Sequence, residues 1–396
     1  MQSTPHKLIL ALSYLTFLLF GMFTAAIGPT LGELSHQTGA SLAAIGGVLT
    51  CLFLGSVIAQ LAGGPLNDRL GYKPVLVASM AVMAVGVVAF TNARSLPLMF
   101  ALALIAGLGQ GGVDMGANLV VADAAPRNTT SALNLLHFFF GLGAFIGPAL
   151  VGFAILLTGA GLIVQWIIAV LFAVLAVTMA FMLRPGAAAQ RGARDADGAK
   201  TIGLGIYLSP LLWLMGALML IYVGVELGLG SWISTYMGIS TGMLAQYGAW
   251  VTSAYWAALA VGRLAGAAAS KSIGRVRLLA IALTGSLLGG IALFFSRQTE
   301  IPTVLSLVWI AFFYGTVYPT TVALAASAFP RDTGKALGIL VALGSIGAAA
   351  LPLLAGQLLE QSIAGYLWFV VVGLALLPML LLGIGRLTKA PSSPVV

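Results

Sequence analysis

Long apolar runs, separated by short polar segments, repeat along the whole chain. Each holds about 20 residues or more, the length of helix that crosses roughly 30 Å of hydrocarbon. Nothing resembles the alternating pattern of membrane β-barrel strands. The pattern predicts an all-α membrane protein with twelve spans, at about 8–31, 41–66, 74–92, 96–122, 131–157, 161–184, 208–237, 244–269, 277–296, 301–329, 335–361 and 365–387.

A polar segment divides these spans into two groups of six. PGAAAQRGARDADGAKT (185–201) is too rich in alanine, glycine and charge to cross a membrane. We therefore expect an N-terminal six-helix bundle at 1–184, a cytoplasmic linker at 185–207 and a C-terminal six-helix bundle at 208–396.

An internal repeat supports this division. A shift of 204 residues sets ADAAPRNTTSAL (122–133) on ASAFPRDTGKAL (326–337), and it also sets Gly143 on Gly347. Two similar six-helix halves in parallel orientation are the arrangement expected of major facilitator transporters, with pseudo-symmetric bundles.

Composition excludes most other classes of protein. Hydrophobic residues make up 60% of the chain and charged residues 7%, and the mean hydropathy is +1.07, too apolar for a soluble domain. The one cysteine, Cys51, excludes an intrachain disulfide. No phosphate loop, metal-ligand cluster or nucleophile with a base is found, so we expect no enzyme, no cofactor and no ATP-driven pump.

The basic residues predict the orientation of the chain. If the N-terminus is inside, the cytoplasmic segments hold most of the Lys and Arg, and the opposite loops hold only Arg94 and Arg297. Both termini and the linker are therefore expected in the cytoplasm, with the protein in the cell inner membrane. The basic residues behind the net charge of +8 flank apolar spans rather than forming one basic face, so this charge does not indicate nucleic-acid binding.

We expect Arg263, inside a span, to extend to the cytoplasmic surface or to pair with a loop acid. Glu33, at an outer end, is expected to be solvated.

The loop after the second span carries a signature. Gly64-Pro-Leu-Asn-Asp-Arg-Leu-Gly-Tyr-Lys73 resembles the G-x-L-x-D-R-x-G-[RK]-[RK] motif of the major facilitator superfamily and departs from it at Tyr72. The resemblance implies gating contacts, in which Asp68 meets the start of span 11 while Arg69 and Lys73 engage Asp123. The alternative is that these basic residues only enforce topology.

Polar residues inside the spans are the candidate transport site. Asp114 and Asn118 share one face of span 4, and Asn134 and His137 share one face of span 5. A charge at mid-bilayer costs about 2.5 to 3.5 kcal/mol, so such residues normally face a partner or a watery cavity. The alternative is a hydrogen-bonded clamp between helices.

Span 7 holds the second buried acid, Glu226, which we expect to bind substrate or cation, or else to pair with a basic or amide group. Burial of a carboxylate favours its neutral form, so Asp114 or Glu226 could carry a proton. Among the aromatic residues of the second half, Trp250 and Tyr318 are candidates for contact with a sugar ring. The alternative assigns them to packing or to interfacial belts.

Three motifs carry a narrower resemblance. DMGAN (114–118), N-x-x-H-x-x-x-G-x-G (134–143) and YVGVE (222–226) with its downstream glycines are similar to the fucose permease-like branch, which includes sugar–proton symporters and sodium–glucose carriers. One departure is that Phe17 to Pro29 contains no acid, whereas fucose permease has one in its first span.

The sequence therefore predicts a monomeric secondary transporter that imports a sugar, coupled to a cation gradient, most simply protons. The alternatives are a proton-driven exporter of drugs or amphipathic metabolites and a non-transporting receptor or scaffold. The predicted substrate site comprises Asn118, Asn134, His137, Glu226, Trp250 and Tyr318, with coupling at Asp114 and Glu226.

Overall fold

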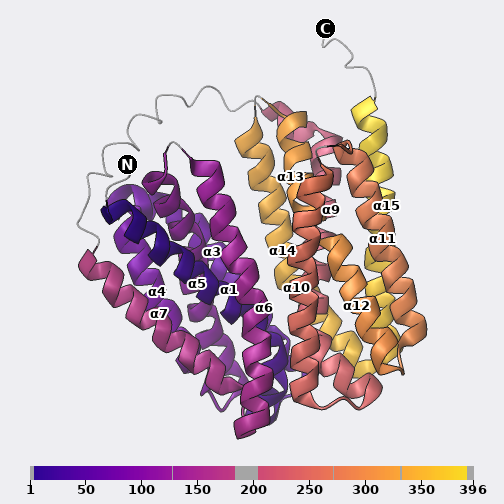
Figure 1. Ribbon diagram of the computed structural model, residues 1–396, viewed down its shortest axis with the longest axis horizontal. Coiled ribbons are helices and arrows are strands. Elements are labelled where there is room, and N and C mark those ends of the chain that lie inside the picture. The colour runs from indigo at the N-terminus through magenta and orange to yellow at the C-terminus, as the bar shows by residue number, and fades with distance from the viewer. Residues whose placement is uncertain (1–3, 127, 183–203, 271, 331, 390–396) are drawn as a thin grey trace. The chain divides into compact units, whose positions relative to one another are not determined.

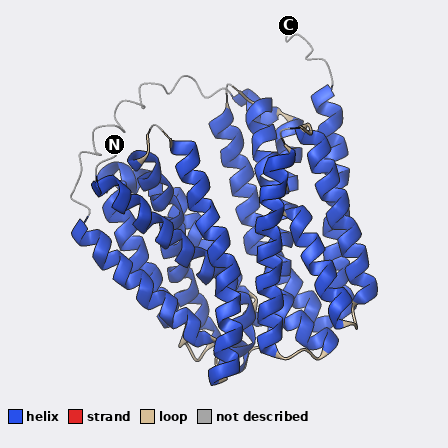
Figure 2. Cartoon of the chain, viewed as in Figure 1, coloured by secondary structure: helices blue, strands red, loops and turns tan. Residues whose placement is uncertain are grey.

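The computed structural model describes residues 4–126, 128–182, 204–270, 272–330 and 332–389. These residues form helices and the turns between them, without a strand (Figure 2). The first half contains α1 (Thr4–Thr38), α2 (Leu42–Ile45), α3 (Gly47–Leu70), α4 (Tyr72–Thr91), α5 (Leu96–Ala124), α6 (Thr129–Thr158) and α7 (Leu162–Met182) (Figure 1). The second half contains η3 (Leu204–Leu208), α9 (Pro210–Thr241), α10 (Ala245–Ala269), α11 (Arg275–Ser296), α12 (Glu300–Tyr314), α13 (Val317–Ala328), α14 (Thr333–Gln361) and α15 (Ile363–Lys389).

Each of the twelve predicted spans is helical, which confirms the fold class. Eleven helical segments of the described chain are long and apolar enough to cross a membrane. The remaining span, α10, is less apolar because it carries two tryptophans, two tyrosines and Arg263 among its alanines.

Two spans contain a break that the hydropathy pattern did not predict. The second span turns at Gly46 between α2 and α3, and the tenth turns at Gly315 and Thr316 between α12 and α13. Pro319 explains the second break, because proline has no N–H to donate and its ring collides with the carbonyl four residues earlier, that of Gly315. Helical bonding resumes with Thr320 N donating to Thr316 O at 3.3 Å.

The residues fall into two compact units, and the boundaries between these units do not coincide with the predicted linker. One unit comprises Met1–Thr201 with Gly230–Ala257, and the other comprises Ile202–Leu229 with Ala258–Val396. Within the first unit, Ser253 Oγ donates to Phe145 O at 2.6 Å. This contact ties the first part of α10 to α6. Residues 185–203 of the predicted linker lie outside the described residues, and the domain boundaries at 184 and 208 stay a prediction.

Close helix contacts rely on glycines at corresponding places in the repeat. In the first unit, a Cβ atom at Gly143 of α6 would collide with the Leu18 carbonyl oxygen and lie 2.9 Å from Met22 N of α1. In the second unit, a Cβ atom at Gly347 of α14 would collide with the Leu220 carbonyl of α9. Small residues let membrane helices approach closely, so both halves use this repeat position for packing.

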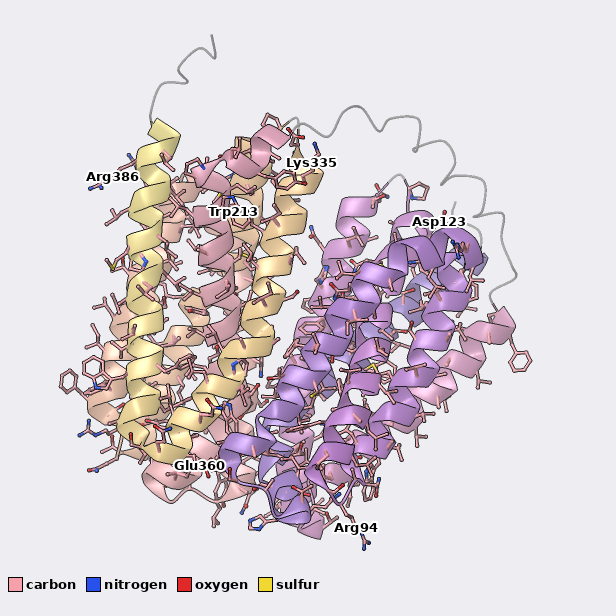
Figure 3. All side chains as sticks on the ribbon, turned by 180° about the vertical axis from the view of Figure 1, so that it is seen from behind. Arg94, Asp123, Trp213, Lys335, Glu360 and Arg386 are labelled. Atoms are coloured by element: carbon pink, nitrogen blue, oxygen red, sulfur yellow. The ribbon has the colours of Figure 1, made fainter. Side chains whose placement is uncertain are left out.

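Charged residues lie at the ends of the helices (Figure 3), and the side of the membrane that each end faces stays a prediction. In the first unit, Asp123 and Arg94 lie at opposite ends of the helices (Figure 3). In the second unit, Lys335 and Arg386 lie at the end opposite to Glu360 (Figure 3). Lys335 and Arg386 therefore lie at the same end of the second unit (Figure 3).

The expectation for Glu33 is wrong, because its side chain is half-buried rather than solvated. Its carboxylate accepts hydrogen bonds from the backbone N–H groups of Gly161 and Leu162, the latter at 3.2 Å, where α7 begins. A negative charge is favourable at a helix N-terminus. The contact joins residues 129 positions apart, so hydropathy alone could not show it.

We expect Gly21→Ala to destabilise the protein and Gly32→Ala on the same helix to leave it unchanged or slightly more stable. A Cβ atom at Gly21 would collide with the Phe140 carbonyl oxygen of α6, whereas one at Gly32 meets nothing within 4 Å. Overpacking costs about 1 to 3 kcal/mol, while alanine improves helix propensity by up to about 1 kcal/mol. Thermal unfolding in detergent measures both, and a Tm of Gly21→Ala at or above that of Gly32→Ala would contradict the packing.

Candidate transport site

Asp114 is the centre of a polar cluster in the first unit. It lies 18 residues after the start and 10 before the end of the 29-residue α5, about 27 Å and 15 Å along the axis. Its Oδ1 accepts from Asn118 Nδ2 at 3.2 Å, and its Oδ2 lies 3.5 Å from Gln60 Nε2 of α3, at the long limit of a hydrogen bond. Gln60 also donates to Ser56 Oγ at 3.2 Å. Among the described residues, no Lys, Arg or His is ion-paired with Asp114.

Sequence reasoning missed two members of this cluster, Gln60 and Ser56. They lie one turn apart on α3, in a stretch whose hydropathy predicts only a membrane span. An amide inside a predicted span is the signal that could have found Gln60. Its proximity to Asp114 depends on how α3 and α5 pack, which one sequence does not show.

Asn134 and His137 lie on α6, and both side chains are exposed. The His137 ring packs edge-on against Phe17 of α1, with ring centroids 5.5 Å apart. Polar side chains on an apolar helix are expensive toward lipid, so their exposure is better suited to a watery path. Their place in the substrate site stays a prediction.

Glu226 and Arg263 form an ion pair in the second unit, with Arg263 Nη2 3.9 Å from Glu226 Oε1. The Glu226 side chain is 10% exposed and the Arg263 side chain 34% exposed. The expectation that Arg263 extends to the cytoplasmic surface or pairs with a loop acid is therefore wrong. Each Cα–Cβ bond in a helix tilts toward the N-terminus, which directs Arg263 back along α10 rather than out of its end.

Tyr222 and Tyr314 lie near Glu226, and Tyr318 lies beside Tyr222. The Tyr222 ring lies 4.8 Å from that of Tyr314 and 6.4 Å from that of Tyr318, between centroids. Tyr222 and Tyr314 are fully buried, whereas Tyr318 is half-buried. The predicted residues Glu226 and Tyr318 thus lie in one cluster, drawn from α9 and α13, with Arg263 of α10.

Trp250 takes part in a helix contact within the first unit. Its Nε1 donates to Ala149 O of α6 at 3.3 Å, and its ring lies 5.2 Å from that of Phe153. A Cβ atom at Gly152 would collide with the same indole. The structure therefore gives Trp250 a packing role beside the predicted one of contacting a sugar.

The motif from Gly64 to Lys73, which ends α3 and begins α4, makes a contact that the resemblance did not imply. The Tyr72 hydroxyl donates to the Asp123 carboxylate, so the departure from the family pattern supplies a bond to the acid that ends α5. Arg69 is exposed and Lys73 is half-buried. The side chain of Asp68 lies outside the described residues, as do Arg127 and Arg331 of the repeat.

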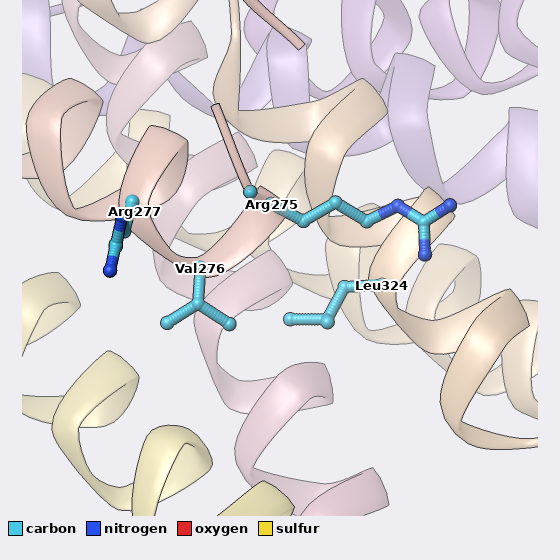
Figure 4. Close-up of a pocket in the computed structure, with 5 residues that line it drawn as sticks. Arg275, Val276, Arg277 and Leu324 are labelled. Atoms are coloured by element: carbon cyan, nitrogen blue, oxygen red, sulfur yellow. The ribbon is translucent and has the colours of Figure 1, made fainter. Parts of the chain in front are cut away.

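A pocket of about 400 Å³ lies where α11 begins. Gly274, Arg275, Val276, Arg277 and Leu324 line it. Figure 4 shows the Arg275 side chain extending toward the Leu324 side of the pocket, while Arg277 points elsewhere. Both arginines are exposed, and no predicted site residue lines this pocket.

Twelve helical spans, with an acid inside a span of each half, are the arrangement of a multi-pass membrane protein. A family model described as Major Facilitator Superfamily matches residues 13–248 and 232–395. The chain belongs to this superfamily.

Known relatives support the family at low identity. The chain is 29% identical to the uncharacterised MFS-type transporter YfkL of Bacillus subtilis over 153 residues, which is 39% of this chain and 38% of that protein. It is 24% identical to human sodium-dependent glucose transporter 1 over 380 residues, 87% of this chain and 72% of that protein. The crystal structure of a D-xylose–proton symporter matches with a TM-score of 0.76 and 16% identity, over 94% of this chain and 96% of that one.

Tyr72→Phe is expected to weaken the contact with Asp123, and Tyr72→Arg to restore it with the basic residue of the family pattern. A hydrogen bond to a charged group contributes about 1.5 to 3 kcal/mol, and less at an exposed position. Thermal unfolding in detergent should give a lower Tm for the phenylalanine variant than for the arginine variant. Equal Tm values for the phenylalanine variant and the unaltered protein would show that the contact contributes nothing.

Proposed function

We propose that this transporter imports a small hydroxyl-rich solute, a sugar, across the cell inner membrane by alternating access coupled to a cation gradient, with the proton as coupling ion. The observation that carries the proposal is Asp114, a carboxylate well inside α5 whose described partners are amides rather than cations. A group of this kind can exchange a proton with a watery path without breaking an ion pair. Similarity to a sodium-dependent glucose transporter over most of the chain, and the shared fold of a D-xylose–proton symporter, support the sugar.

The proposal gives each polar group a role. Asp114 binds the coupling ion, and Asn118, Asn134 and His137 offer hydrogen bonds to hydroxyl groups from the first half. Glu226 and Tyr318 do so from the second half, and Glu226 also contributes to coupling. Trp250 contributes through its ring, since its indole nitrogen already bonds Ala149.

The remaining parts of the proposal concern gating and orientation. Asp68, Arg69, Lys73 and Asp123 latch the cytoplasmic side, and Tyr72 adds its bond to Asp123. Both termini face the cytoplasm because basic residues flank the spans on that side. The protein works as a monomer.

Export of drugs or amphipathic metabolites is the second candidate, and the glycines of α6 are the feature that favours it. The glycine-rich face of α6 resembles a motif linked to exporters in the family. Gly143 and Gly147 of this face pack against Leu18 and Met22 of α1, so helix packing accounts for both glycines. Helix packing is therefore a second explanation for these glycines, beside export.

Asp114→Asn is expected to abolish gradient-driven accumulation while leaving exchange of substrate intact. An amide keeps the shape and hydrogen bonds of the site but cannot gain or lose a proton. The measurement is uptake of labelled sugars and sugar acids into proteoliposomes, under an imposed pH gradient or sodium gradient, with counterflow as the exchange assay. Glu300→Gln, at an exposed acid where α12 begins, is the control.

The outcomes separate the claims. Full accumulation by Asp114→Asn would overturn the coupling role of this residue. Accumulation driven by sodium alone would replace the proton as coupling ion. The absence of gradient-dependent uptake for every compound of the panel would overturn the sugar function itself.

A further inference from the structure

The ion pair of the second unit has a geometry that suits substrate binding. Glu226 lies 16 residues after the start and 15 before the end of the 32-residue α9, so it is near the middle of its span. Arg263 reaches it with one guanidinium nitrogen at 3.9 Å, beyond the range of a hydrogen bond. The contact is an ion pair without the two parallel hydrogen bonds that make arginine–carboxylate contacts strong.

The Arg263 guanidinium has N–H donors that are available to a ligand. A guanidinium carries five N–H donors, and Arg263 makes no side-chain hydrogen bond with another described residue. Its side chain is 34% exposed, whereas that of Glu226 is 10% exposed. An incoming group can therefore reach the arginine more easily than the glutamate. The fork of a guanidinium matches carboxylate in shape and charge.

A clamp between helices would not need these charges. Replacing a buried ion pair by well-packed apolar residues is often neutral or stabilising, so the pair is weak evidence for a purely structural role. A neutral sugar would not need a cation either, because hydroxyl groups can be bound by amides such as those beside Asp114. The charge of Arg263 is thus unexplained by packing or by a neutral solute.

We propose that the solute carries a carboxylate, so that it is a sugar acid, and that Arg263 binds this carboxylate when Glu226 holds a proton. The inference rests on the proposed function and narrows its substrate class. One proton from the outer solution neutralises Glu226 and releases Arg263, which then pairs with one monoanion. The Glu226 proton and the anion leave together on the inner side and carry no net charge between them.

The surroundings of the pair fit a hydroxylated ring. Arg263 of α10, Tyr222 of α9 and Tyr314 of α12 are among the groups that act electrostatically on Glu226. The buried Tyr314 hydroxyl has no hydrogen-bond partner among the described residues. Tyr318 of α13 lies beside Tyr222 and is half-buried, so it can contact a ring from the accessible side.

The test compares sugars that differ in one group. Proteoliposomes holding the full chain are given an inward pH gradient and labelled D-glucose or D-glucuronate, and D-galactose or D-galacturonate as a second pair. We expect at least about tenfold faster uptake of the acids, which corresponds to roughly 1.4 kcal/mol. Equal or faster uptake of the hexoses would overturn the inference while the proposed function stands. If neither these four compounds nor any other sugar is taken up under a gradient, the inference and the proposed function are both overturned.

Variants of the pair test the assignment to Arg263. Arg263→Gln is expected to lower uronate uptake at least about tenfold. Arg263→Lys is expected to raise KM while largely preserving the maximal rate, because it keeps the charge and loses the fork. Glu226→Gln should bind uronate with an affinity independent of pH. If Arg263→Gln does not fold, a KM of Arg263→Lys equal to that of the unaltered protein would overturn the role, as would unchanged uptake by a folded Arg263→Gln.

Discussion

A carboxylate inside an apolar helix is the constraint on which the whole account depends. Transfer of a charge to mid-bilayer costs about 2.5 to 3.5 kcal/mol even on the lenient scale, so each such group must have a partner, a proton or water. The two halves meet this requirement in different ways. Asp114 is held by amides, and Glu226 is held beside a guanidinium.

In the proposed mechanism, this difference gives the two halves separate roles. The glycine contacts of α1 with α6 and of α9 with α14 occupy corresponding positions, so the two halves share a packing scheme. Their polar interiors are not alike. A carboxylate without a cationic partner suits an exchangeable ion, whereas a cation beside a second carboxylate suits an anionic group of the solute. Alternating access requires both sites to meet the same watery path.

Much of the fold could be predicted from hydropathy, and less of the site. The span predicted at 96–122 is α5, Leu96–Ala124, and that at 244–269 is α10, Ala245–Ala269. Helical length and apolarity determine such limits directly. The break before Pro319 follows from local chemistry that a hydropathy window averages out. The pairing of Gln60 with Asp114 and the cap made by Glu33 depend on packing between distant helices, and the direction of Arg263 depends on the tilt of Cβ along its helix.

Access of water to the Asp114 cluster is the most direct test of the central claim. The single cysteine permits a Cys51→Ser background, into which Asn118→Cys is introduced, with Val174→Cys on the exposed apolar face of α7 as control. A thiol reacts as its thiolate, which needs water. In intact membranes, a charged thiol reagent should modify the cysteine at 118 and leave that at 174 unmodified. An unreactive cysteine at 118, from either side of the membrane, would mean that the acid lies in a dry helix contact and would contradict the account.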